Sequence, residues 1–328
     1  MHVSLKLIAF AVTGLALAAC QSSSQAQTLR ERLQDRAAAR QGLDDVAGGE
    51  VISVAVNGQS RQFIVAAPPS GRASSAVLVF HGGRGSADRT FASNSIKDAA
   101  ATQGFLAVYP NAVDGNWTDG RASTAGGPDD VAFTRVIIAE IAARYGVDPN
   151  RVFATGISNG AMMTYRLACD APGLIRAIAP VAGNLPDAQQ ARCAGAAATP
   201  VMMFSGTDDP IMPFAGGQMG AGSGPLARTL SGADPVASAP GTAAFWAGVN
   251  GCGAASATPL PDAVSDGTSV TRVTHSCPAS AEVVLYQIEG GGHTWPGAGG
   301  EGSRLVGEVS REVDASSTML GFFRSYGL

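Results

Sequence analysis

Apolar runs that alternate with amphipathic segments set the expected architecture of this chain. Short continuous apolar runs, such as Ala76–Phe80, Val152–Thr155 and Val201–Phe204, are typical of strands buried on both faces of a sheet. Between them lie segments with helical periodicity, for example Val131–Arg144, whose apolar residues gather on one face. This alternation predicts an α/β fold with a mostly parallel central sheet and helices on both faces.

The same patterns predict the remaining elements. Asn57-Gly58 separates two alternating runs, which predicts a hairpin with a type I′ turn. The expected strands are 51–56, 61–65, 76–80, 105–109, 152–155, 175–181, 201–204 and 283–288, and the expected helices are 95–103, 131–144, 160–168, 243–249 and 315–324. The Gly/Ala/Pro/Ser-rich stretch 215–240 has no clear period, and it is equally compatible with a loop over a site and with a surface excursion.

The N-terminus has the features of a targeting segment. After Lys6, the apolar stretch Leu7–Leu17 is too short to span a bilayer comfortably. It ends in Leu17-Ala-Ala-Cys20, which resembles the bacterial lipobox, where the cysteine is lipidated and becomes the mature N-terminus. We therefore expect a lipoprotein signal peptide at 1–19, a tether with a short helix at 20–48, and the folded domain at 49–328.

Either form of processing would take the mature chain out of the cytoplasm. A lipid on Cys20 would hold it at the bacterial cell envelope, on a membrane, whereas an ordinary signal peptide cut near Ala26 would release it. If Cys20 carries lipid, four cysteines remain, and they allow three pairings. We favour the pairs that close local loops, Cys169–Cys193 and Cys252–Cys277. The rival interpretation is a metal site, but no CxxC or HxxxH spacing supports it, and we expect no metal.

Charge excludes one class of function. The chain has a formal net charge of -4 over 328 residues, and its arginines are scattered. No basic stripe is available to neutralise phosphates, so we expect no nucleic-acid partner.

The segment Gly156-Ile-Ser158-Asn-Gly160 lies where a predicted strand gives way to a predicted helix. In a nucleophile elbow the serine occupies a strained turn, and glycine two positions away on each side removes Cβ atoms that would clash. The helix that follows would point N–H groups at the reacting oxygen. In a chain with 42 glycines the motif could be an ordinary turn, but its context predicts that Ser158 is a nucleophile.

A nucleophilic serine needs a base, and the chain has four histidines, one of them in the signal peptide. His275 lies in a short alternating segment typical of a strand or loop. His81 directly follows a strand, and we expect it to be structural, while Gly82 and Gly83 after it free a backbone N–H for an oxyanion. His293 follows a buried strand, at the edge where α/β sites collect their residues, and is the predicted general base.

The base in turn needs an acid to fix its tautomer. Asp208 and Asp209 follow the strand that ends at Phe204 and lie between the serine and the histidine in sequence. The order Ser, Asp, His is that of the α/β hydrolases. Pro210 restricts the backbone of Asp209 and favours it as the acid, and the alternative for either aspartate is a solvated turn.

Together these stretches resemble one family, the secreted esterases that include polyhydroxybutyrate depolymerases, bacterial feruloyl and acetylxylan esterases, and the LpqC-type lipoproteins. The resemblance covers roughly residue 50 to the end, through 81–83, 116–121, 129–133, 156–160, 206–210, 250–252 and 291–297. It implies an α/β-hydrolase fold, the two local disulfides, and a serine carboxylic-ester hydrolase that needs no cofactor. The implied site is a Ser158–Asp209–His293 triad with an oxyanion hole from the Asn159 N–H and the Gly82-Gly83 turn.

Two features of the sequence differ from the pattern of that family. Arg84 stands where the family has a small residue, which would narrow or charge the site, and a granule-binding module is not recognised, which disfavours insoluble polyester as the substrate. Polyester oligomers and acyl-polysaccharides remain as expected substrates.

Trp117 and Trp295 are candidates to line the acyl or alcohol pocket, with core packing as the alternative. The rival functions are a catalytically silent, ligand-binding envelope lipoprotein and a serine peptidase.

Overall fold

The computed structural model describes residues 43, 45–220, 234–299, 302–303 and 305–328. The expected signal peptide at 1–19, the lipid anchor on Cys20 and most of the tether at 20–48 lie outside the described residues. The first strand begins at Glu50.

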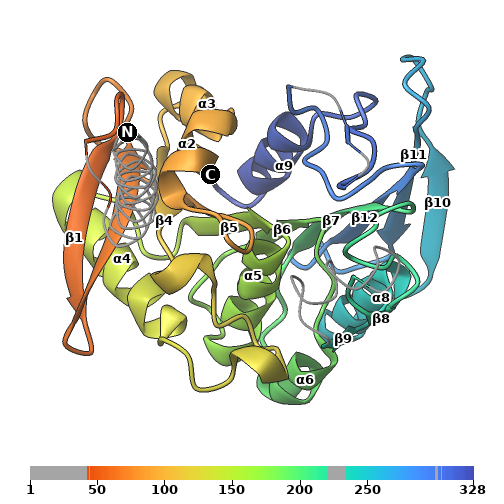
Figure 1. The fold of residues 1–328 in the computed structure, drawn as a ribbon, viewed down its shortest axis with the longest axis horizontal. Helices are drawn as coiled ribbons and strands as arrows, with labels where there is room; N and C mark the ends of the chain where they lie inside the picture. Colours follow the sequence, from red (N-terminus) through yellow and green to blue (C-terminus); the bar gives the residue numbers. More distant parts are fainter. Residues whose placement is uncertain (1–42, 44, 221–233, 300–301, 304) are drawn as a thin grey trace, which may run out of the picture. The chain divides into compact units, whose positions relative to one another are not determined.

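Ten strands of the described residues form one sheet in the order β1-β2-β4-β3-β5-β6-β7-β12-β11-β10 (Figure 1). The strands are β1 (Glu50–Val56), β2 (Gln59–Ala66), β3 (Ala76–Phe80), β4 (Leu106–Pro110), β5 (Val152–Ile157), β6 (Ile178–Val181), β7 (Val201–Gly206), β10 (Ala255–Pro259), β11 (Ser269–His275) and β12 (Val283–Glu289). The six central strands, β4 to β12 in that order, are parallel, and the two strands at each edge pair antiparallel. The predicted parallel sheet is confirmed.

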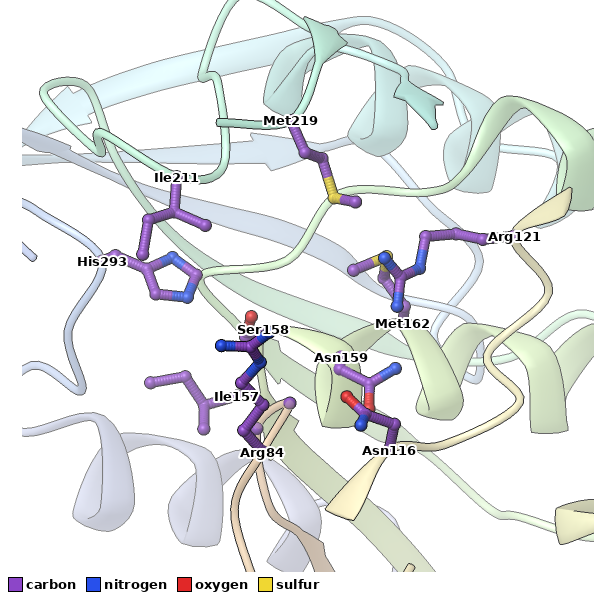
Figure 2. A pocket seen from close by; sticks show the side chains of 12 residues that line it. Arg84, Asn116, Arg121, Ile157, Ser158, Asn159, Met162, Ile211, Met219 and His293 are labelled. Atoms are coloured by element: carbon purple, nitrogen blue, oxygen red, sulfur yellow. The ribbon is translucent and has the colours of Figure 1, made fainter. Parts of the chain in front are cut away.

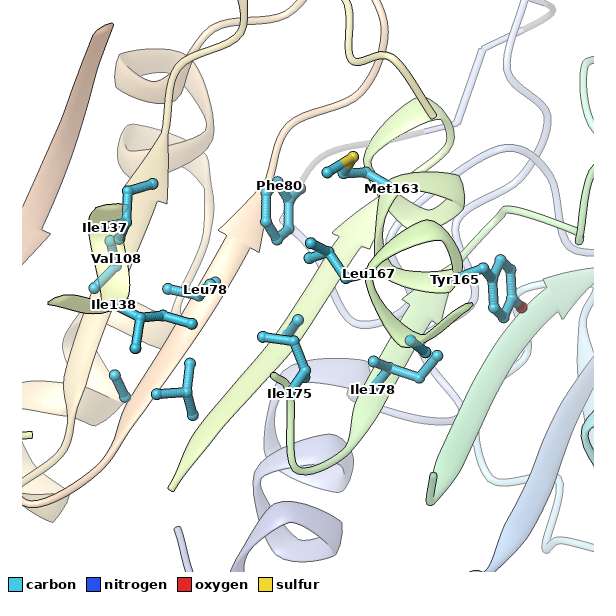
Figure 3. Packing of buried hydrophobic residues seen from close by; sticks show 14 of the residues in the cluster. Leu78, Phe80, Val108, Ile137, Ile138, Met163, Tyr165, Leu167, Ile175 and Ile178 are labelled. Atoms are coloured by element: carbon cyan, nitrogen blue, oxygen red, sulfur yellow. The ribbon is translucent and has the colours of Figure 1, made fainter. Parts of the chain in front are cut away.

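Helices cover both faces of this sheet, as the sequence predicts. The helices are α2 (Ala87–Ser93), α3 (Ile96–Gln103), α4 (Asp130–Tyr145), α5 (Asn159–Asp170), α6 (Asp187–Gln190), α8 (Ala239–Val249) and α9 (Ala315–Arg324). Alternate residues of β3 enter separate clusters: Leu78 and Phe80 pack with α4 and α5 (Figure 3), whereas Val77 and Val79 pack with α2, α3 and α9. Because both faces are covered, the strand is apolar throughout.

The sheet register brings together the loops that carry the predicted site. Phe80 of β3 pairs with Gly156 of β5, so the loop from His81 lies beside the turn at Ser158. Gly206 of β7 pairs with Ile288 of β12, so the loops that follow these two strands also meet. All four loops leave the carboxyl ends of parallel strands, which share one edge of the sheet.

Several elements differ from the sequence prediction. The strand β10 is absent from the prediction because its side chains are polar or small and all five residues are exposed, which leaves no hydrophobic alternation to detect. It is held by antiparallel pairing with β11, whose last residue is His275. Helix α2 is also absent from the prediction, because its seven residues are too few to establish a helical period.

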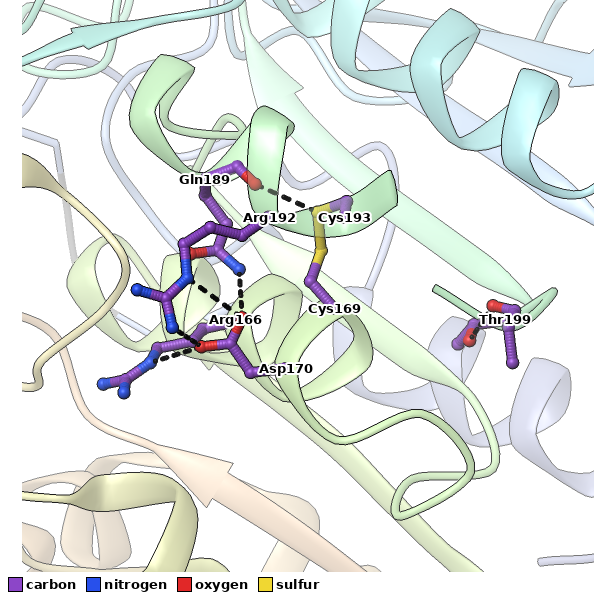
Figure 4. The surroundings of a disulfide bond; sticks show 8 residues. Arg166, Cys169, Asp170, Gln189, Arg192, Cys193 and Thr199 are labelled. Atoms are coloured by element: carbon purple, nitrogen blue, oxygen red, sulfur yellow. Dashed lines mark hydrogen bonds and ion pairs between the residues drawn. A yellow bond between two sulfur atoms is a disulfide. The ribbon is translucent and has the colours of Figure 1, made fainter. Parts of the chain in front are cut away.

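Two disulfides have the favoured pairing, Cys169–Cys193 and Cys252–Cys277. The first joins the last turn of α5 to the 3₁₀ helix Ala191–Gly195. Beside it Asp170 accepts hydrogen bonds from the side chains of Arg166, Gln189 and Arg192 (Figure 4). A covalent bond and a charged cluster therefore fix the same corner of the molecule.

Candidate active site

Ser158 occupies the sharp turn between β5 and α5. Its backbone has φ 59° and ψ -121°, a conformation that costs energy for any residue with a side chain. A Cβ on Gly156 would lie 2.6 Å from the carbonyl oxygen of Phe80, and one on Gly160 only 2.3 Å from the same atom. Both glycines are thus required by close packing of the turn against β3, as expected for a nucleophile elbow.

Gly160→Ala is expected to destabilise the domain by about 2 kcal/mol or more, because the added Cβ would meet two backbone carbonyl oxygens that cannot move aside independently. The matched control is Gly321→Ala on α9, where no atom lies within 4 Å of the added Cβ. That change should leave stability unchanged or raise it by up to about 1 kcal/mol. Thermal unfolding followed by circular dichroism gives both values, and equal melting temperatures for the two variants would contradict the packing argument.

His293 is held against Asp209. Its Nδ1 lies 2.8 Å from Asp209 Oδ2, and the other carboxylate oxygen accepts backbone hydrogen bonds from Ile211 (2.8 Å) and Met212 (2.7 Å). A carboxylate acceptor at Nδ1 keeps the proton on that nitrogen and leaves Nε2 unprotonated. Asp208, by contrast, is exposed, and its carboxylate accepts a hydrogen bond from the Thr207 hydroxyl. The structure brings Asp209, not Asp208, to the histidine.

The loop that carries His293 is positioned by close backbone contacts. The His293 N–H donates to the carbonyl of Val306, and the Gly292 N–H donates to that of Glu308. A Cβ on Gly292 would lie 2.1 Å from the Val306 oxygen, and one on Gly206 would lie 2.1 Å from the Gly291 oxygen. Glycine at these positions lets the histidine loop pack directly on its neighbours.

The Gly82-Gly83 turn lies beside the elbow. A Cβ on Gly82 would lie 3.6 Å from the Ser158 Cβ, and one on Gly83 would lie 3.6 Å from the Asn159 Cβ. The turn is closed by the N–H of Gly85, which donates to the Gly82 carbonyl at 3.0 Å. The backbone N–H groups proposed for the oxyanion therefore lie on two segments that meet at the serine.

Ser158, Asn159, Gly82, Gly83 and His293 line one cavity of about 350 Å³ (Figure 2). In Figure 2 the imidazole of His293 extends toward the Ser158 side chain. The remaining lining residues are Arg84, Asn116, Arg121, Ile157, Met162, Ile211 and Met219, and the apolar ones among them were not predicted from the sequence to line the site. Met219 belongs to the stretch 215–240, so the N-terminal part of this stretch reaches the site. Residues 221–233 of the stretch lie outside the described residues.

The interpretation of Trp117 and Trp295 as lining residues is wrong. Trp117 is 1% exposed, and its indole N–H donates to the His81 carbonyl at 2.9 Å, so it fills the core beneath the site. Trp295 is half-buried, and its indole donates to the Ser316 hydroxyl of α9 at 3.1 Å. Neither borders the cavity of Ser158. The aromatic residues lie next to site motifs in sequence, but their side chains point to the packing layers.

His81 is a buried structural residue. Its Nε2 accepts the backbone N–H of Ala112 at 3.1 Å, and its Nδ1 lies 2.8 Å from the Gly82 carbonyl oxygen. Burial lowers the pKa of His81 to about 4, which keeps the ring neutral at pH 7 as these two bonds require. The ring holds the start of the Gly82-Gly83 turn, as expected.

A buried polar network supports the segment 116–121. Arg61 and Asp130 form an ion pair at 2.7 Å, and the second Asp130 oxygen accepts the N–H of Thr118 at 2.7 Å. The Asn159 side chain accepts the Trp117 N–H and donates to the Trp117 carbonyl. Asn159 therefore contributes its amide as well as its backbone, a role that the sequence motif did not indicate. No group of three His, Cys, Asp or Glu side chains within the described ranges is placed to hold a metal ion.

Known proteins resemble this chain in both sequence and fold. The family model of phospholipases and carboxylesterases matches residues 130–222. "Putative esterase NocK" of Nocardia uniformis subsp. tsuyamanensis is 31% identical over 282 residues, which are 82% of this chain and 80% of that protein. Feruloyl esterase B of Piromyces equi is 29% identical over 69% of this chain, which spans 41% of that protein's length.

Among solved structures, the acetyl xylan esterase from Aspergillus awamori superposes with a TM-score of 0.56. The match covers 84% of this chain and all of that one, at 15% sequence identity, and it shows a shared fold. The parallel sheet and the sharp turn at Ser158 agree with these similarities. The chain belongs to the esterase family of the α/β-hydrolase fold that includes "Putative esterase NocK", and it is a serine esterase.

Proposed function

We propose that this esterase hydrolyses carboxylic esters through an acyl-enzyme on Ser158, with His293 as the general base and Asp209 as the residue that orients it. One observation carries the proposal. Ser158 and His293 line the same cavity, and the Nδ1 of His293 lies 2.8 Å from Asp209 Oδ2. This is the arrangement in which a carboxylate, an imidazole and a hydroxyl act in sequence.

The reaction follows from these positions. The Ser158 hydroxyl oxygen attacks the ester carbonyl carbon while His293 Nε2 accepts its proton, and negative charge develops on the carbonyl oxygen. Backbone N–H groups of Asn159 and of the Gly82-Gly83 turn stabilise that charge. The histidine then returns the proton to the leaving alcohol. A water molecule next attacks the acyl-enzyme carbonyl while His293 accepts its proton, and the acid is released as that proton returns to the Ser158 oxygen.

The proposed substrates are esters of small acids or phenolic acids on larger alcohols, including polyester oligomers and acyl-polysaccharides. Feruloyl esterase B and the acetyl xylan esterase support this range by their names. A hydrolysis screen over feruloyl esters, acetylated xylan, hydroxybutyrate oligomers and 4-nitrophenyl butyrate tests it. Turnover of at least one of these is expected, whereas binding without turnover of any would favour a silent ligand-binding protein.

We also propose that the chain is exported and held at the cell envelope by a lipid on Cys20, on the strength of the sequence Leu17-Ala-Ala-Cys20. No helix of the described residues is long and apolar enough to cross a membrane.

Cys20→Ala is expected to block processing or to release the protein from membranes, because the thiol that accepts the lipid is gone. Expression in a Gram-negative host, followed by membrane fractionation and mass spectrometry of the N-terminus, measures this. A mature N-terminus well beyond Cys20 on a soluble periplasmic protein would overturn the anchor proposal.

A further inference from the structure

The cavity beside Ser158 has two positively charged side chains in its wall. Its lining includes Arg84 and Arg121 and no aspartate or glutamate. In Figure 2 the Arg84 side chain extends toward Ser158, and Arg121 reaches over Asn159. The reaction proposed above uses neither guanidinium group. The charge of Arg121 is balanced by the buried Asp119, so the charge of Arg84 needs another explanation.

Arg84 adopts a backbone conformation that favours glycine. Its φ is 59°, in the left-handed region, and it lies between Gly83 and Gly85. Its backbone N–H donates to the Gly115 carbonyl at 2.7 Å, which fixes this conformation. A long side chain in this region costs conformational energy, and such outliers cluster at binding sites.

The charge of Arg84 is not neutralised by any carboxylate of the described residues. Asp88 and Asp114 lie on adjoining segments, but neither forms an ion pair with it. The side chain is exposed at the cavity wall, where an incoming anion can reach it. An unpaired guanidinium presents a planar set of donors that matches a carboxylate.

Arg121 is held rigidly in its place. Its Nε lies 3.0 Å and 2.8 Å from the two carboxylate oxygens of Asp119, which is fully buried. The Asn159 side-chain amide also donates to Asp119, so the same carboxylate links Arg121 to the first residue of α5. The ion pair thus fixes Arg121 in the cavity wall and balances its charge.

Several other residues of the cavity lining are apolar. Met162 and Met219 belong to a small buried cluster with Met212 and Val236, and Ile211 lines the cavity close to them. Methionine side chains adapt to ligands of different shape. The cavity lining therefore contains both apolar side chains and the guanidinium of Arg84, and this combination suits a substrate with an apolar part and a negative charge.

We infer that this enzyme selects esters that carry a carboxylate close to the scissile bond, with Arg84 as the residue that binds the carboxylate. Half-esters of dicarboxylic acids belong to this class, and so do hydroxy acids that are acylated on the hydroxyl and keep a free carboxylate. The inference rests on the proposed function. The carboxylate can lie on the acyl side or on the alcohol side of the bond, and the two are separated by experiment.

The test compares isosteric pairs of anionic and neutral esters. On the alcohol side the pair is 4-acetoxybenzoate and 4-acetoxybenzamide, and on the acyl side it is the 4-nitrophenyl esters of adipic acid and of adipic monoamide. For at least one pair, kcat/KM should be at least about tenfold higher for the carboxylate. The preference should shrink as salt rises from about 20 mM to about 500 mM, because the cavity is open to solvent. A ratio near one for both pairs would overturn the inference.

Variants assign the effect to Arg84. Arg84→Gln should bring the anionic-to-neutral ratio of kcat/KM close to one, Arg84→Lys should retain part of it, and Arg84→Glu should invert it. The control is Arg89→Gln on α2, which removes the same charge from an exposed residue outside the cavity lining and should leave the ratio unchanged. An unchanged ratio in Arg84→Gln would refute the assignment. Failure of the parent enzyme to hydrolyse any of the four esters would instead contradict the proposed function.

Discussion

Ser158→Ala is expected to reduce the hydrolysis of 4-nitrophenyl butyrate by several orders of magnitude while the fold stays intact. The loss is large because the proposed acyl-enzyme forms on this hydroxyl, and His293 and Asp209, the proposed base and acid, cannot replace it. The fold should survive because alanine and serine meet the same steric demand at φ 59°, and the close packing of Gly156 and Gly160 is untouched.

Steady-state kinetics and circular dichroism on the same preparation measure both parts of this result. Ser93→Ala, an exposed serine on α2, is the matched control and should keep parental activity. A Ser158→Ala variant with activity within tenfold of the parent would remove the basis for the serine mechanism.

Asp209→Asn is expected to lower kcat by at least about a hundredfold, whereas Asp208→Asn should stay within about tenfold of the parent. The amide can still accept the backbone hydrogen bonds from Ile211 and Met212 through its oxygen. It then presents an NH₂ group to His293 Nδ1, which favours the tautomer with the proton on Nε2 and removes the base. The loss therefore falls on kcat rather than on stability.

The two adjacent aspartates serve as controls for each other. Asp208 is exposed, and its carboxylate accepts a hydrogen bond from the hydroxyl of Thr207, so its substitution changes the loop charge but not the contacts of the histidine. If Asp208→Asn is the impaired variant, the acid moves by one residue. If neither is impaired, this loop does not supply the acid.

The fold was predictable from the sequence where a strand is buried on both faces, or where the apolar pattern of a helix agrees with its capping residue. Strand β3 and helix α9 have a clear apolar pattern, and Asp314 caps α9 by accepting the N–H of Ser317. By contrast, β10 is fully exposed and owes its conformation to pairing with β11. Pairing across the sheet is a non-local interaction that a pattern along one segment does not reveal.

The site shows the same division between local and non-local information. The nucleophile turn is a local motif, so Ser158 could be singled out from its glycines and its strand-to-helix context. Pro210 favoured Asp209 for a local reason, but the observed placement depends on the N–H groups of Ile211 and Met212 and on a loop 84 residues away. Trp117 was misassigned because side-chain direction into core or cavity depends on neighbours distant in sequence.

Reaction with a fluorophosphonate followed by mass spectrometry shows directly whether Ser158 is the nucleophile, because the reagent forms a stable covalent bond only with an activated serine. We expect one phosphonyl group per chain on the peptide that contains Ser158, with loss of esterase activity in proportion to the labelling. We also expect no labelling of Ser158→Ala and slow labelling of Asp209→Asn. An enzyme that hydrolyses esters while Ser158 stays unmodified, or that is labelled on a different serine, would contradict this assignment.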